Sequence, residues 1–290
     1  KENTTGIYNT ALGANALRDT TTANNNVAIG LNTMIASTTG AANTAVGSQA
    51  LDAATTASNN TTVGYLSSTG ITTGDRNVAV GTEALKACVT HAANTAIGYH
   101  ALLNNTQNSN TAVGAYSLDA NTSGADNVAV GSASLSANTT GSNNVAIGVS
   151  ALGSNTTGIY NTTVGDQTLV TNTSGVQNTA VGQGALYSNT THNNNAFGYH
   201  ALLSNSSGAS NCAFGSHSLD NNTSGARNTA MGHRAMDANT TGSDNTVIGS
   251  NALDANTTGG DLTAVGVGAL STNTTASFNS AFGYYALRLN

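Results

Sequence analysis

Apolar and polar positions along this chain return in the same order almost every 17 residues. We take the glycine of the recurring Asn-Thr-Ala-Val-Gly unit as position 0. An apolar residue precedes it at position −1 in every copy, and Leu or Met follows at position +4 in every copy except one, which has Ser68. The 17 glycines are residues 13, 30, 47, 64, 81, 98, 114, 131, 148, 165, 182, 198, 215, 232, 249, 266 and 283. Such regular repetition predicts stacked units, each touching only its neighbours.

Each copy is too short, and too often interrupted by glycine and asparagine, to form a helix. A helix needs about 10–12 residues, whereas a strand needs four to eight. The run from position −4 to position −1 is rich in β-branched residues and suits a strand. We expect a second short strand through positions +1 to +5. The chain is thus predicted to be all-β, a parallel β-solenoid of about 17 coils of 17 residues with two short strands per coil. At ~4.8 Å per coil, the spacing of paired strands, it would extend for roughly 80 Å.

Stacking aligns equivalent positions of successive coils, so positions −1 and +4 are predicted to form two apolar ladders in a thin core. Burying one Val or Leu side chain contributes roughly 1.5–3 kcal/mol, so no coil is stable alone. The usual Ala at position −2 could face either the interior or a partner chain. The predicted core ladders include Val130, Ile147, Val164 and Val181 at position −1, and Leu135, Leu152, Leu169 and Leu186 at position +4.

Asparagine occupies position −4 in 16 of the 17 copies, with Leu262 as the exception. Identical Asn side chains repeated every ~4.8 Å can hydrogen-bond as a ladder. We therefore assign a structural role to Asn127, Asn144, Asn161 and Asn178. A second asparagine at position +7 begins Asn-Thr-Thr and Asn-Thr-Ser triplets, such as the one at Asn138. These triplets fit turn chemistry, and they also match the acceptor for N-glycosylation.

Composition narrows the possible classes of function. Only 7% of the residues are charged, the net charge is −6, and there are seven Lys and Arg in total. No basic run is present, so nucleic-acid binding is not expected. No stretch approaches ~18 consecutive apolar residues, so no membrane insertion is expected. We expect residues 1–290 to form a single repeat domain that is a segment of a longer chain.

The sequence offers little catalytic or metal-binding chemistry. It has no nucleophile elbow, phosphate loop or paired carboxylates, so we expect no enzyme activity and no cofactor. His200 and His217, both at position +2, are adjacent in the stack, yet zinc usually takes three or four protein ligands and no third one is evident. Aspartates recur at position +5, and those at 220, 237 and 254 would lie on consecutive coils. Their carboxylates could attract a calcium ion weakly, since calcium prefers oxygen ligands. We therefore predict no metal site.

Positions +1 and +2 vary most among the copies, which is typical of an outward surface on a constant frame. Tyrosine there is suited to contact with a receptor, a glycan or a neighbouring chain. The predicted contact residues are Tyr99, His100, Tyr199, His200, His217, Tyr284 and Tyr285.

The unit Asn-x-Ala-x-Gly, as in residues 127–131 and 144–148, resembles the head repeats of trimeric autotransporter adhesins. It is similar also to repeats of phage and viral tail fibres and of bacterial surface proteins. The resemblance covers nearly the whole chain and implies a left-handed parallel β-roll that assembles as a homotrimer. Adhesin coils are generally shorter, so the Asn-Thr-Thr-Gly segment lengthens a turn here.

We expect a non-enzymatic structural role, as the shaft or head of an extracellular fibre. Such a fibre would be a cell-surface appendage, a secreted filament or part of a virion. Its partners would be further copies of the chain, as a homotrimer or end to end, and a cell-surface receptor or glycan. The alternative is a solenoid module that binds ice through the Thr residues at position −3, or a glycan through its Tyr and Asn rows.

Overall fold

The computed structural model describes residues 3–288, which fall into two compact units that divide between Asn143 and Asn144. Each unit is described by itself. Both consist of stacked coils with one short strand per coil and no helix among the described residues. The expectation of a single domain over residues 1–290 stays a prediction.

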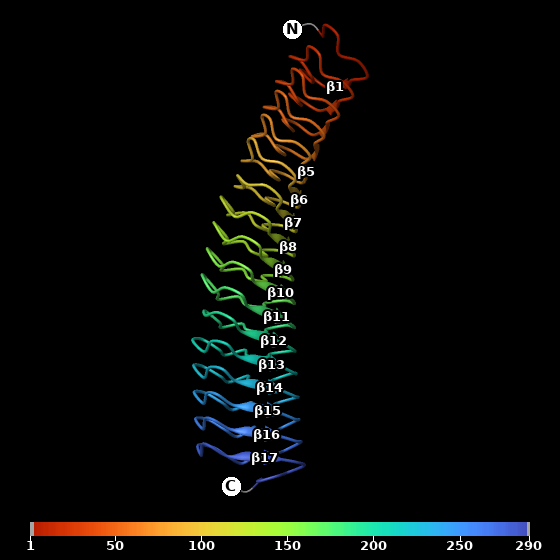
Figure 1. Ribbon diagram of the computed structural model, residues 1–290. Coiled ribbons are helices and arrows are strands. Elements are labelled where there is room, and N and C mark those ends of the chain that lie inside the picture. Colours follow the sequence, from red (N-terminus) through yellow and green to blue (C-terminus); the bar gives the residue numbers. More distant parts are fainter. Residues whose placement is uncertain (1–2, 289–290) are drawn as a thin grey trace. The chain divides into compact units, whose positions relative to one another are not determined.

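The first unit contains eight three-residue strands that pair in parallel and in chain order (Figure 1, red to green). Each strand pairs with the next at the equivalent repeat position, as Thr10 does with Val27. The 16-residue coil keeps this register, since Thr95 pairs with Thr111. The strands are β1 (Thr10–Leu12), β2 (Val27–Ile29), β3 (Thr44–Val46), β4 (Thr61–Val63), β5 (Val78–Val80), β6 (Thr95–Ile97), β7 (Thr111–Val113) and β8 (Val128–Val130).

The second unit repeats this plan with nine strands (Figure 1, green to blue). They too pair in parallel, each with the next, and Thr179 keeps the register across the second 16-residue coil by pairing with Asn195. The predicted parallel β-solenoid is thereby confirmed. The strands are β9 (Val145–Ile147), β10 (Thr162–Val164), β11 (Thr179–Val181), β12 (Asn195–Phe197), β13 (Cys212–Phe214), β14 (Thr229–Met231), β15 (Thr246–Ile248), β16 (Thr263–Val265) and β17 (Ser280–Phe282).

The second strand expected in each coil, through positions +1 to +5, does not form. That segment has left-handed backbone at positions +2 and +4, as at Gln167 (φ 54°) and Leu169 (φ 50°). Backbone hydrogen bonds still join the coils here, for example from the Leu169 N–H to the Ala185 carbonyl at 3.0 Å. Alternating left-handed residues interrupt the extended conformation that a strand requires. The leucine of each coil is therefore presented to the core by a turn.

The core lies behind the strands, and the expectation that position −1 contributes to it is wrong. Side chains alternate between the two faces of a strand, so positions −4 and −2 point inward and positions −3 and −1 point outward. Ala180 is completely buried, whereas Val164 remains 37% exposed. Among the predicted core residues, Leu135, Leu152, Leu169 and Leu186 are fully buried, Val130 and Val181 are half-buried, and Ile147 and Val164 are exposed.

The asparagines at position −4 form a buried hydrogen-bonded ladder. The Asn144 Oδ1 accepts from both the backbone N–H and the Nδ2 of Asn161, at 3.0 and 3.2 Å. The Asn161 Nδ2 also donates to the Gly175 carbonyl at 2.9 Å. Asn178 repeats the pattern on the Asn161 Oδ1, and Asn127 does so in the first unit on the Oδ1 of Asn110. The polar side-chain atoms of Asn144, Asn161 and Asn178 are thus paired, as burial demands.

Candidate functional site

The predicted contact residues at positions +1 and +2 gather in small ring clusters. In the second unit, the Tyr199 ring stacks on His200, with ring centroids 3.8 Å apart. His217, one coil further on, meets both rings edge to face at 5.3 and 5.4 Å. Tyr284 and Tyr285 form a separate pair with centroids 4.4 Å apart.

Asp220, which the sequence placed only in the row at position +5, joins the histidines. The His217 Nδ1 lies 2.7 Å from the Asp220 Oδ2. One ligand atom each from His200, His217 and Asp220 lies within 4.8 Å of the other two. The structure therefore brings a carboxylate oxygen to the histidine pair, which had no evident third ligand in the sequence. The signal that the sequence reasoning missed is the three-residue spacing of positions +2 and +5. The turn between these positions brings their side chains together.

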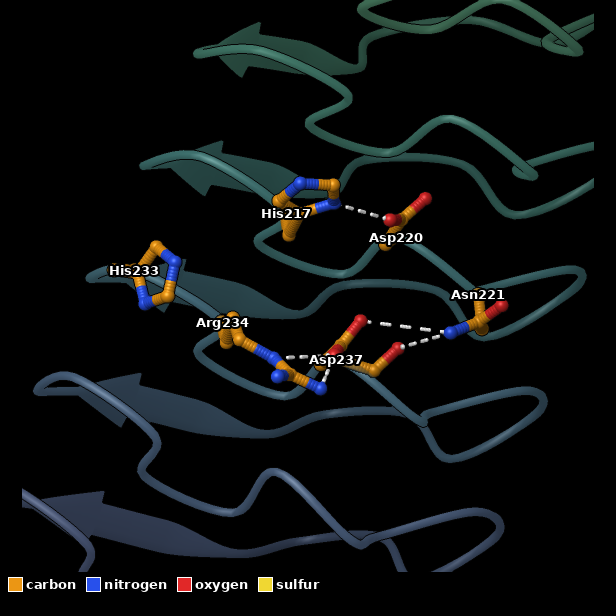
Figure 2. A pocket seen from close by; sticks show the side chains of 6 residues that line it. All are labelled: His217, Asp220, Asn221, His233, Arg234 and Asp237. Carbon is orange, nitrogen blue, oxygen red and sulfur yellow. Dashed lines mark hydrogen bonds and ion pairs between the residues drawn. The ribbon is translucent and has the colours of Figure 1, made fainter.

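A shallow groove of about 460 Å³ runs beside this cluster over two adjacent coils. Figure 2 shows the His217 ring and the Asp220 carboxylate turned toward each other on one coil, and Arg234 turned toward Asp237 on the next. The Arg234 Nη2 is 2.8 Å from the Asp237 Oδ2. Asn221 donates to the Asp237 backbone carbonyl at 3.1 Å.

The aspartates at position +5 do not form a free acidic row. Asp220 and Asp237 each have a partner at position +2 of their own coil, and the pKa of Asp254 is raised by burial. Paired carboxylates attract a hard cation weakly, because calcium needs several charged oxygen ligands. The row therefore gives no support to a calcium site.

The first unit carries a related cluster with one exchange. Tyr99 stacks on His100 at 3.8 Å, and the ring that meets them from the next coil is Tyr116, in the position that His217 has in the second unit. The His100 Nε2 lies 3.3 Å from a Glu83 oxygen. Asp119 has the place of Asp220, but its Oδ1 has no hydrogen-bond partner and burial raises its pKa. The two units thus differ in the capacity of this surface to bind a cation.

The outward face of the strands is uncharged in every coil and carries an apolar row at position −1. Position −1 holds Val, Ile, Leu, Phe or Met throughout, and position −3 holds no charged residue. In the second unit the exposed fractions at position −1 reach 52% at Phe214 and 70% at Phe282. The residues of this row that are classed as exposed are Leu12, Val63, Ile97, Ile147, Val164, Phe214, Met231, Ile248 and Phe282.

The asparagine rows are withdrawn from solvent, so they offer no surface to a glycan. The Asn172 Nδ2, which would carry a glycan, donates to the Asn155 Oδ1 at 3.0 Å and to the Gly175 carbonyl at 3.1 Å. Asn138 is equally buried. In the folded coil these nitrogens cannot carry a glycan, and the regular Asn-Thr-Thr and Asn-Thr-Ser triplets serve the turn.

The two cysteines are free, and burial raises the pKa of Cys88 to about 11, which keeps that thiol protonated at neutral pH. Within residues 3–288 no helix is long and apolar enough to cross a bilayer.

Comparison with known protein families and with curated proteins finds no match for this chain. The class that the fold defines is a parallel β-solenoid repeat protein.

Proposed function

We propose that this chain is a segment of the shaft or head of an extracellular fibre in which copies of the chain associate side by side. The observation that carries the proposal is the exposed apolar row at position −1. Soluble monomers rarely expose contiguous apolar patches of more than a few hundred Å², and such patches mark interaction sites. An apolar row that recurs in every coil of each unit is expected to be covered in the working protein.

A second copy of the same chain is the partner that fits this row best. An apolar side chain at position −1, exposed or half-buried, recurs once per coil, at the ~4.8 Å spacing of paired strands. Another copy carries the same row with the same spacing, so apolar side chains can interdigitate along each unit. A partner without this period would match only a few coils. The homotrimer implied by the resemblance to adhesin repeats is one closed arrangement of such contacts.

The mass of the purified chain in solution tests this proposal. We expect light scattering to give about three times the chain mass of 28.7 kDa. Replacing Val164 and Phe214 together by lysine should reduce the mass to that of one chain, because charges would be buried at the contact. Ser174→Lys, on an exposed turn away from that row, is the matched control and should leave the mass unchanged. A wild-type monomer would contradict the proposal, and large species of varied length would favour end-to-end filaments.

Binding to ice is a second candidate, favoured by one observation. Thr162 and Val164 belong to the same outward face of β10, and similar Thr-x-Val triplets recur in other coils. Regular hydroxyl and methyl rows on a flat sheet could match a lattice. Seven of the 17 coils have another residue in place of the threonine, which interrupts the row. Thermal hysteresis of the purified chain clearly above that of buffer would support this candidate, and a value equal to buffer would remove it.

A further inference from the structure

The cluster of His200, His217 and Asp220 has the composition of a transition-metal site. Imidazole nitrogen suits zinc, copper and nickel, and two histidines with one carboxylate leave open positions for water. Zinc holds such ligands at about 2.0–2.2 Å, which places the ligand atoms roughly 3–3.5 Å from one another. The His217 Nδ1 and Asp220 Oδ2 are already 2.7 Å apart, and all three ligand atoms lie within 4.8 Å. Small side-chain rotations therefore suffice to close the site.

The surroundings leave this cluster available and accessible. Arg234, on the following coil, is paired with Asp237, and the Asp220 carboxylate is paired with His217. On the preceding coil, position +2 is Gly184, which has no side chain to cover His200. An open groove of about 300 Å³ lies beside His200 and Gly184. His217 and Asp220 line the separate groove of about 460 Å³, so open space adjoins all three side chains.

The first unit supplies an internal comparison. Its cluster has Tyr99, His100 and Asp119 at the same repeat positions, with Tyr116 where the second unit has His217. A phenol with a pKa near 10 is a poor ligand for a divalent ion at neutral pH, in contrast to a neutral imidazole. Among the described residues, only the cluster of the second unit brings three potential ligands together.

We propose that His200, His217 and Asp220 bind one divalent transition-metal ion, with zinc or copper as the preferred occupants. Two imidazole nitrogens disfavour calcium and magnesium, which prefer oxygen ligands. The ion would join position +2 of two successive coils and so clip them together. Because it binds the folded chain, it would also raise the apparent stability. This inference does not depend on the proposed role in a fibre.

Isothermal titration calorimetry of the full chain with ZnCl₂ tests the site. The wild type is expected to bind one ion per chain. His217→Tyr copies the arrangement that the first unit already has, so it should fold, and it should weaken binding by at least about tenfold. Asp220→Asn should also weaken binding. His233→Gln, an exposed histidine of the next coil, is the matched control and should bind as the wild type does.

A variant of the first unit that gains metal binding complements these losses, because failure to fold cannot explain a gain. Tyr116→His places a second imidazole beside His100 and Asp119, so the stoichiometry should rise from about one ion per chain to about two. Electron paramagnetic resonance with Cu²⁺ should show coupling to nitrogen in the wild type and a change in that coupling in His217→Tyr. Absence of zinc binding at millimolar concentration, or equal binding by the wild type and His217→Tyr, would overturn the proposal.

Discussion

Replacing Gly182 by alanine is expected to lower the free energy of unfolding by about 4 kcal/mol or more. Losses of this size arise where backbone strain and steric overlap act together. Gly182 has φ 120°, a conformation that side chains of L-residues rarely adopt. An added Cβ would lie 2.6 Å from both the carbonyl carbon and the oxygen of Gly198 on the next coil. Those atoms belong to the stacked backbone and cannot move without separating the coils. Urea unfolding followed by circular dichroism measures the effect.

Gly184, two residues further on, is the matched control for this prediction. Its φ of 68° lies in the left-handed region that other coils fill with ordinary residues, such as His217 at φ 55°. The nearest atom to an added Cβ is the His200 Cδ2 at 2.8 Å, at the end of a side chain that can turn toward solvent. Gly184→Ala should therefore cost only about 1–2 kcal/mol. Similar losses for both variants would show that the close approach of coils at position 0 is not what restricts this position.

Replacing Asn161 by leucine is expected to cost about 3 kcal/mol or more, because each buried polar group left unpaired costs about 1–3 kcal/mol. The change removes the side-chain oxygen that accepts from the N–H and the Nδ2 of Asn178, at 3.0 and 3.1 Å. It also removes the donor to the Gly175 carbonyl. Both Asn161 and Asn178 are fully buried, so water cannot replace these bonds. The same urea titration gives the loss.

Leu262 supplies a natural control, because it occupies the same repeat position. Its own N–H still donates to the Asn245 Oδ1 at 3.0 Å, so the preceding asparagine remains paired. The following Asn279 is half-buried rather than buried, so water can reach the groups that lack a partner there. Leu262→Asn should therefore change the stability by no more than about 1 kcal/mol. A cost for Asn161→Leu as small as this would contradict the view that the buried ladder stabilises the stack.

The sequence by itself determined the architecture and its register. A period of 17 residues, kept through two 16-residue coils, requires equivalent positions to stack, whatever the local conformation is. The buried leucine at position +4 and the paired asparagine at position −4 follow from this stacking, because a thin core needs an apolar filler and a buried amide needs an identical neighbour. Leu169 and Asn161 lie where this reasoning expects them.

The direction of each side chain depended on the tertiary structure. Ala and Val are both apolar, so the pattern could not distinguish the inward Ala180 from the outward Val164. The missing second strand has the same origin, because Leu169 adopts a left-handed conformation that residue type alone does not favour. Burial of the leucine and the hydrogen bonds to the next coil stabilise that conformation, and neither can be read from a single copy of the repeat.

The meeting of His217 with Asp220 was likewise decided by the fold. Positions +2 and +5 are polar or variable in most copies, and only the turn at positions +2 to +4 folds them onto each other. The stack then adds His200 from the preceding coil. The sequence determined which coils are neighbours, since that follows from the period. The tertiary structure decided which atoms of those neighbours meet, because that depends on backbone angles that the repeat does not specify.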